Sequence, residues 1–183
     1  ETELGRIFDY LKATYQYDSK LIVFTSDHGE QLGDHYLFGK LGYFDASYHI
    51  PLIIRDPKRQ LQKVKTLEHF SESVDVMPTI LDWLGLEIPD QCDGRSLLPF
   101  LENEIPRNWR EEVHSEFDFR WIGSYQPMIE ERFGLLPDEC SLVIIRDDDY
   151  KYVHMTALPP LFFDLKRDPG EFINRVQDPD YRE

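Results

Sequence analysis

Cysteine, long apolar runs and positive charge are all scarce in this chain. Its only two cysteines, Cys92 and Cys140, lie far apart, so they provide neither a disulfide framework nor the short spacing of a zinc knuckle. This cysteine usage is compatible with a reducing, intracellular setting, and we favour the cytoplasm. No stretch approaches the roughly 20 apolar residues that a membrane-spanning helix needs, so we expect no membrane partner.

The shortage of positive charge is large. Lys and Arg together number 20, Asp and Glu number 35, and the net charge is −15. A nucleic-acid-binding surface needs clustered Lys and Arg, so we expect no nucleic-acid partner. An anionic substrate is not excluded, because a bound metal and a local lysine can override the global field.

What is present is typical of a packed globular protein. Hydrophobic residues make up 41% of the chain and aromatic residues 14%, which is too many for a disordered chain. The length of 183 residues suits one domain, or one and a fraction. Apolar residues at helical spacing predict helices over residues 5–15 and 75–84. We expect Ser73 or Asp75 to cap the second helix and Gly85 to end it.

Apolar runs predict strands in both halves of the chain. Two runs, at residues 21–25 and 51–55, suit a sheet buried on both faces. A linker marked by Pro and Gly follows over residues 86–108. Beyond it we expect a hairpin turn at Asp147–Asp149 and a short terminal helix ending near Val176. Four further strands are predicted at Val113–Phe119, Leu142–Arg146, Tyr150–Met155 and Leu161–Leu165.

The most informative stretch follows the first predicted strand. Asp27 and His28 come where that strand should end, and ligands of open α/β sheets bind beyond the carboxyl ends of the strands. A carboxylate oxygen and an imidazole nitrogen both suit a divalent metal ion. We therefore expect the two side chains to converge at the carboxyl end of a parallel strand. On spacing alone, a helix cap with a neighbouring loop histidine is the alternative.

The same loop contains candidates for binding an anion. Lys40, preceded by Gly39, is a mobile cation of the kind that an oxygen-rich anionic group would need beside a metal. Asp34 and His35 lie between the metal pair and Lys40 and are candidates to line the same pocket. The alternatives are an ordinary surface lysine and an exposed loop pair.

Four blocks of the sequence, in order, carry a resemblance to a known family. They are Leu21–Lys40, Tyr48–Pro57, Ser73–Gly85 with Asp93–Pro99, and Leu161–Asn174. Through them the chain resembles the sulfatase family of the alkaline phosphatase superfamily, especially its phosphonate monoester hydrolase branch, which overlaps with the arylsulfatases. The resemblance implies an α/β, alkaline phosphatase-like fold seen as its C-terminal half. A small antiparallel sheet plus helix would form the C-terminal subdomain.

The resemblance also implies a metal-dependent hydrolase of sulfate esters, phosphonate monoesters or phosphodiesters. Asp27 and His28 match metal ligands, for manganese, calcium or zinc, and Lys40 matches the lysine that contacts the sulfate or phosphonate group. The nucleophile of the family is a formylglycine, whose hydrate attacks sulfur or phosphorus. Asp-His in place of Asp-Asn favours the phosphonate hydrolase and phosphatase side. We expect a small anionic ester as substrate and a homo-oligomer at full length.

The nucleophile motif of the family is not found in this chain. Formylglycine is made from Cys or Ser in a Cys/Ser-x-Pro-x-Arg motif, and neither Cys92 nor Cys140 precedes x-Pro-x-Arg. We therefore expect the C-terminal part of such an enzyme, inactive alone, with residues 1–105 in the main α/β domain and 106–183 in the small subdomain. Two alternatives stay open: a non-catalytic interaction module of this fold, and a phosphatase or phosphotransferase with a Ser or Thr nucleophile.

Overall fold

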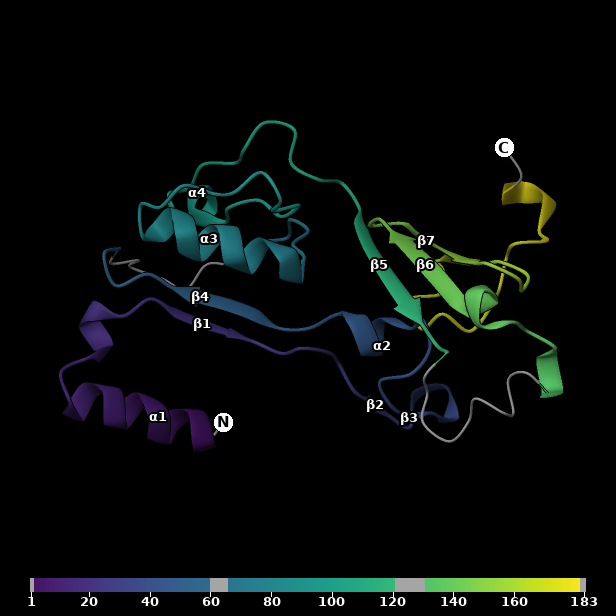
Figure 1. Cartoon of the computed structure of the whole chain (residues 1–183), viewed down its shortest axis with the longest axis horizontal. Coiled ribbons are helices and arrows are strands. Elements are labelled where there is room, and N and C mark those ends of the chain that lie inside the picture. The colour runs from purple at the N-terminus through teal and green to yellow at the C-terminus, as the bar shows by residue number, and fades with distance from the viewer. Residues whose placement is uncertain (1, 60–65, 121–130, 182–183) are drawn as a thin grey trace. The chain divides into compact units, whose positions relative to one another are not determined.

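A computed structural model describes residues 2–59, 66–120 and 131–181 of the chain (Figure 1). The chain divides into two compact units, each built from separate stretches of sequence. The first comprises Glu1–Gly29, His49–Glu68 and Ser73–Arg107, and the second comprises Glu30–Tyr48, His69–Glu72 and Asn108–Glu183. The domain boundary suggested at residue 105 stays a prediction. In the described part of the chain, no helix is long and apolar enough to cross a membrane.

The first unit begins with the helix expected near the N-terminus. This helix, α1, spans Thr2–Ala13, and the strand β1 follows at Ile22–Thr25. β1 pairs with β4, which spans Leu52–Arg55, in a register that sets Val23 opposite Ile54. All three elements lie where the apolar periodicity predicted them.

The expectation of a parallel sheet buried on both faces is wrong for these strands. β1 and β4 form a two-stranded antiparallel sheet, and Ile53 on β4 is 60% exposed. A short apolar run predicts that a strand forms but does not fix the direction of its neighbour. Parallel neighbours need a crossover that is usually a helix. The segment between β1 and β4 instead folds into a short hairpin and the one-turn helix α2, Asp45–Tyr48.

A buried carboxylate fastens the second predicted helix. This helix, α3, spans Val76–Trp83, and Gly85 follows it with a φ of 70°. Asp75 does not cap α3 as expected, since its side chain makes no hydrogen bond to the first turn. Its Oδ1 instead accepts a hydrogen bond of 2.8 Å from the backbone N–H of Arg95. The Asp75 carboxylate is therefore bonded to the loop at Arg95 and not to the first turn of α3.

That loop passes very close to the start of α3. A Cβ at Gly94 would lie 2.0 Å from the carbonyl oxygen of Val74, so a side chain cannot be accommodated without a backbone shift. The backbone N–H of Leu97 donates to the Thr79 hydroxyl at 2.9 Å. A short helix that the linker prediction missed, α4, then forms at Leu98–Leu101.

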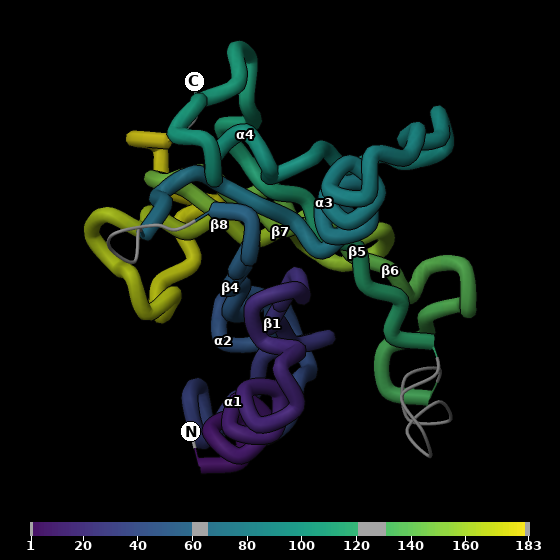
Figure 2. Tube along the Cα trace, turned by 90° about the vertical axis from the view of Figure 1, so that its left-hand side faces the viewer, coloured from purple at the N-terminus to yellow at the C-terminus, as the bar shows by residue number. Residues whose placement is uncertain are grey.

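The second unit is built on a four-stranded antiparallel sheet (Figure 1; Figure 2). Its strands follow one another as β5-β6-β7-β8 and confirm the four predicted strands. The predicted turn at Asp147–Asp149 is also confirmed, because Asp147 Oδ1 accepts hydrogen bonds from the backbone N–H groups of Asp149 and Tyr150. The core of the unit consists of Leu142, Ile144, Val153, Phe163 and Leu165. The strands span Val113–Asp118, Ser141–Arg146, Tyr150–Met155 and Leu161–Asp164.

The terminal helix predicted to end near Val176 does not form. Among the described residues after β8, the only helical element is a 3₁₀ turn at Pro179–Tyr181. Side chains take the backbone N–H groups that a helix would use: Asp168 Oδ2 accepts from Ile173, and Asn174 Oδ1 accepts from Val176. Asp and Asn side chains compete in this way with the backbone hydrogen bonds of a helix. The spacing of apolar residues does not reveal this competition.

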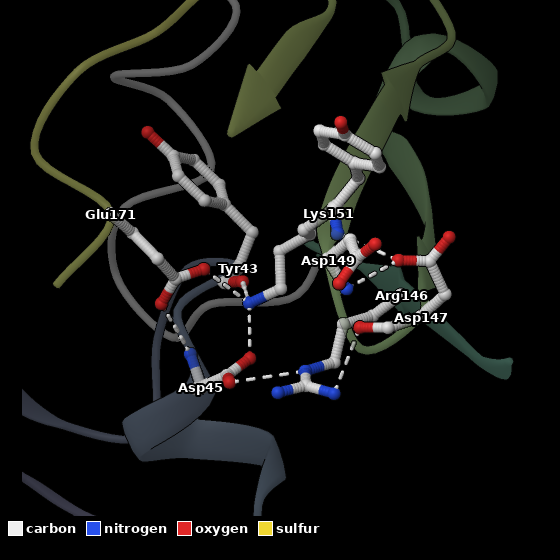
Figure 3. A network of polar contacts seen from close by, with 8 residues as sticks. Tyr43, Asp45, Arg146, Asp147, Asp149, Lys151 and Glu171 are labelled. Atoms are coloured by element: carbon white, nitrogen blue, oxygen red, sulfur yellow. Dashed lines mark hydrogen bonds and ion pairs between the residues drawn. The ribbon is translucent and has the colours of Figure 1, made fainter. Parts of the chain in front are cut away.

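A buried lysine holds three segments of the second unit together (Figure 3). Lys151, on β7, is 1% exposed. Its ammonium donates to Asp45 Oδ1 at 2.5 Å, to the Tyr43 carbonyl at 3.0 Å and to a Glu171 carboxylate oxygen. These three bonds use all of its N–H groups. Arg146 lies beside Asp45 as a second cation, with Nε 3.2 Å from Oδ2. We call these five residues the Lys151 cluster.

The charges of the Lys151 cluster balance, with two cations facing two carboxylates. The second oxygen of Glu171 accepts a hydrogen bond of 2.8 Å from the backbone N–H of Asp45. The φ of Glu171 is 58°, a left-handed conformation that costs a non-glycine residue roughly 1–2 kcal/mol. Burial opposes ionisation of Asp45, but the attraction and hydrogen bonds of Lys151 and Arg146 outweigh it and lower the pKa of that carboxyl.

The close approach at Gly94 predicts a large effect of a single methyl group. Gly94→Ala should destabilise the first unit by about 1–3 kcal/mol, because the new Cβ collides with the backbone of Val74. Gly5→Ala in α1 is the matched control: nothing lies within 4 Å of its Cβ, and Ala in place of Gly should add about 0.5–1 kcal/mol there. Urea unfolding measures both. A Gly94→Ala protein as stable as the parent would show that the loop does not pass so close to α3.

The stability that Asp45 provides should be lost in acid. Because folding lowers its pKa, the contribution is complete above the ordinary value of 3.8 and disappears as the pH falls through the lower folded value. Asp45→Asn should therefore cost stability near neutral pH, and its deficit should shrink below pH 3.8. Unfolding curves across this range test the effect. Asp148→Asn, at an exposed turn position, should follow the parent throughout, whereas a constant deficit for Asp45→Asn would exclude the linkage.

Candidate functional site

Asp27 and His28 follow β1 directly and lie side by side in the first unit. Asp27 Oδ2 and His28 Nε2 are 3.6 Å apart. The Asp27 side chain is exposed, and His28 is half-buried. The Ser26 hydroxyl donates a hydrogen bond of 2.8 Å to the His28 carbonyl and so holds the turn. A short local turn is enough to present both side chains in the same direction.

The tautomer of His28 follows from its nearest hydrogen-bond partner. Its Nδ1 lies 2.7 Å from the Gly29 carbonyl oxygen. A carbonyl oxygen only accepts, so Nδ1 carries the hydrogen, and in the neutral imidazole Nε2 has the lone pair. Metal-binding histidines are commonly fixed in this way. Two donors about 2.0–2.2 Å from one tetrahedral ion lie roughly 3.3–3.6 Å apart, so the separation of Asp27 and His28 fits a shared divalent ion.

Asp27 and His28 offer only two of the ligands that a firm metal site needs. Within residues 2–59, 66–120 and 131–181, no group of three or more His, Cys, Asp or Glu side chains is placed to hold a metal ion. Protein sites for such ions have three or four protein ligands. A firm site at Asp27 and His28 therefore requires additional ligands.

His35 and Lys40 belong to the second unit, in a short hairpin. β2, Gln31–Leu32, pairs in antiparallel fashion with β3, Phe38–Gly39. Gly39 has a φ of 89°, which residues with a side chain rarely adopt, and it turns the chain immediately before Lys40. The Lys40 side chain is exposed. Glycine at this position thus determines how the lysine leaves the hairpin.

His35 lies against two aromatic rings in a strained backbone. The φ angles of His35 and Tyr36 are 52° and 60°, in the left-handed region. The imidazole stacks on Phe44 with ring centres 3.6 Å apart and planes 7° apart, and its centre is 4.8 Å from that of Phe172. Such backbone conformations cost of order 1–3 kcal/mol and persist where the surroundings impose them, often at functional sites.

A second costly feature lies in the same hairpin. Gln31 is fully buried opposite Gly39, and within the described part of the chain neither of its side-chain polar atoms has a hydrogen-bond partner. Leaving a buried polar group unpaired costs about 1–3 kcal/mol. The segment that carries His35 and Lys40 is therefore held in a conformation that its own sequence does not favour.

The four predicted site residues fall into two pairs. Asp27 and His28 lie together in the first unit, whereas His35 and Lys40 share one hairpin in the second. Asp34, expected beside His35, is exposed. The metal-binding and anion-binding roles of these residues stay predictions.

Sequence reasoning missed the residues that contact His35 and the chain just after the hairpin. Lys151 could have been found, because buried positions alternate along β7 and Lys151 shares the phase of Val153. A lysine at an inward position is rare unless it is paired. No such sequence signal predicts the contacts of His35 with Phe44 and Phe172, because no helical or strand periodicity relates these three positions.

Known proteins are similar to this chain along most of its length. Residues 33–183 match the family model described as N-sulphoglucosamine sulphohydrolase, C-terminal. The multifunctional alkaline phosphatase superfamily protein PehA of Trinickia caryophylli is 58% identical over 178 residues, which cover 97% of this chain and 34% of that protein. An N-acetylglucosamine-6-O-sulfatase of Bacteroides thetaiotaomicron is 32% identical over 178 residues, covering 95% of this chain and 29% of that protein.

A solved structure agrees in fold as well. The phosphonate monoester hydrolase of Agrobacterium radiobacter matches with a TM-score of 0.87 and 47% identity, over 98% of this chain and 35% of that one. The chain thus spans about a third of the length of these relatives. The predicted α/β, alkaline phosphatase-like fold class is confirmed. On the strength of the family match over residues 33–183, the chain belongs to the sulfatase family of the alkaline phosphatase superfamily.

Proposed function

We propose that the protein to which this chain belongs is a metal-dependent hydrolase of sulfate, phosphonate or phosphate esters. The observation that carries the proposal is the pair formed by Asp27 and His28: Asp27 Oδ2 and His28 Nε2 are 3.6 Å apart, and the hydrogen bond of Nδ1 to the Gly29 carbonyl leaves Nε2 as the atom that can bind a metal. Relatives named as a sulfatase and as a phosphonate monoester hydrolase support both ester classes. Ligand chemistry leaves manganese, calcium and zinc as candidate ions.

Asp27 and His28 would hold the divalent ion from one side. Such an ion activates a nucleophilic oxygen and screens the negative charge of the substrate when it is bound. Asp27 contributes a negative charge that favours binding of a dication. His28 contributes a fixed direction, because its Nδ1–H donates to the Gly29 carbonyl and its ring cannot turn without losing that bond.

Lys40 and His35 would bind the anionic group of the ester. An ammonium placed beside the non-bridging oxygens balances the charge that they gain as the leaving group departs. His35 would present its ring nitrogens in an orientation fixed by Phe44 and Phe172. Groups that are already oriented stabilise a transition state more than mobile groups, because they need no reorganisation during the reaction.

The nucleophile would come from outside these 183 residues. The chain has no Cys/Ser-x-Pro-x-Arg motif, and a formylglycine from such a motif is the nucleophile expected for the family. On this proposal the chain would contribute metal ligands and a cation, but not the nucleophile. A non-catalytic module of the same fold would lack that motif in the full-length protein as well.

The metal-binding proposal predicts the effect of removing either ligand. In the full-length protein, Asp27→Ala or His28→Ala should each weaken metal affinity by at least about 100-fold, because a direct ligand matters more than the outer groups whose loss already costs 10- to 100-fold. Metal content after dialysis and a titration of the metal-free protein measure this. Asp90→Ala, at an exposed carboxylate of the same unit, is the control. Variants that retain the parental affinity would exclude these two residues as ligands.

The proposed role of Lys40 predicts a loss of activity without a loss of stability. Lys40→Ala in the full-length protein should lower kcat/KM about 100-fold, which corresponds to about 3 kcal/mol, on both a sulfate and a phosphonate ester. Its melting temperature should change by only a few degrees, since the side chain is exposed. Lys40→Arg should rescue poorly, because a planar guanidinium does not replace a compact ammonium.

Lys20→Ala removes another exposed lysine and should leave the kinetics unchanged. Full activity of Lys40→Ala on both esters would show that Lys40 is an ordinary surface residue. A full-length parent that hydrolyses none of a sulfate, a phosphonate and a phosphate ester in the presence of metal would refute the proposed hydrolase activity.

A further inference from the structure

The aromatic rings around His35 are tied to the Lys151 cluster at two points. Phe44, which stacks on the imidazole, has a cluster residue on each side in the sequence. Phe172, the second ring beside His35, follows Glu171 directly. The two rings come from parts of the chain that lie far apart in sequence, so Lys151 and its partners form the connection between them.

The ammonium of Lys151 bonds to residues that are next to the two rings in the sequence: Tyr43 and Asp45 flank Phe44, and Glu171 precedes Phe172 (Figure 3). It donates to the Tyr43 carbonyl at 3.0 Å and to Asp45 Oδ1 at 2.5 Å, which fixes the chain on either side of Phe44. It also pairs with Glu171, whose other oxygen accepts from the backbone N–H of Asp45 at 2.8 Å. One buried cation thereby fixes the backbone next to both rings.

Burial strengthens the pairing of Lys151 with Glu171. This pairing matters for Phe172, because that ring is itself weakly held. Lys151 and Glu171 are both buried, and in such surroundings charges attract more strongly than at an exposed site. Phe172 is 75% exposed, so its own packing contributes little to its position. A Cβ at Gly170 would lie 2.5 Å from the Phe172 ring, which shows how closely this turn is folded. The position of Phe172 therefore depends on Glu171.

We propose that Lys151 is a positioning residue for the hairpin that carries His35 and Lys40. By holding Phe44 and Phe172, it keeps the His35 imidazole oriented and maintains the left-handed backbone there. Lys40 lies three residues before Tyr43, so the same anchor restricts its backbone. The inference rests on the proposed function, because it takes His35 and Lys40 to bind the anionic group of the ester.

Three variants of the full-length protein separate positioning from general stability. Lys151→Met removes the ammonium but keeps an unbranched side chain. Lys166→Met is the matched control, since it removes an exposed ammonium of the same unit that pairs with Asp149 at 2.6 Å. Because Lys151→Met leaves the buried Glu171 carboxylate without its cation and Asp45 with Arg146 alone, the variant can fail to fold, so Phe172→Leu serves as the second test. The exposed Phe172 can be replaced with little effect on folding.

The first readout is the NMR signal of the His35 ring protons, which a stacked ring shifts upfield. We expect this shift in the parent, its loss in Lys151→Met, a partial loss in Phe172→Leu and no change in Lys166→Met. His114 and His154, at exposed positions on β5 and β7, report in the same spectra whether the sheet is intact. A purely structural role would leave the His35 signal of a folded variant unchanged.

The second readout is kcat/KM on a sulfate and a phosphonate ester. Lys151→Met should lower it about 100-fold, as small misplacements of binding groups can do, and Phe172→Leu should lower it less. Lys166→Met should match the parent. A folded Lys151→Met or Phe172→Leu protein with a parental His35 signal or parental kcat/KM would overturn the inference. If the parent hydrolyses no ester, the proposed function fails, and the NMR comparison still decides whether Lys151 holds the rings.

Discussion

The buried ammonium of Lys151 is the constraint on which the second unit depends. A charge taken out of water must be paired, and Lys151 satisfies each of its N–H groups with a different partner in the unit. Such a cluster does not guarantee extra stability, because desolvation offsets much of the attraction. What it provides is a single arrangement, since any shift of Asp45 or Glu171 would leave a buried charge without its partner.

The cluster explains how a costly hairpin can persist. Left-handed His35 and Tyr36 and the unpaired amide of Gln31 all oppose the observed conformation. Anchoring the chain just after the hairpin and packing Phe44 on His35 counteract these costs. The pair of Asp27 and His28 needs no such support, because its geometry comes from a turn of a few residues directly after β1. Local contacts thus set the geometry of Asp27 and His28 in the first unit, whereas contacts between residues far apart in the sequence support the hairpin of the second unit.

Membership of the sulfatase family gives these features a chemical context. The chain spans about a third of its relatives, so on the proposed function its candidate metal ligands and its candidate anion-binding lysine would be parts of a larger catalytic arrangement. Two ligands are too few to hold an ion firmly. On the proposed function, this region would present oriented groups, and the stability of each unit would serve that orientation.

The sequence alone determined the order of most helices and strands, the turn at Asp147–Asp149 and the position of Asp27 and His28 after a strand. Hydrophobic period and turn chemistry are local properties, so a short window of residues contains them. Only the tertiary structure decided that β1 and β4 are antiparallel and that Lys151 pairs with Asp45 and Glu171. These outcomes depend on partners far away in the chain, and a local pattern does not contain the identity of a distant partner.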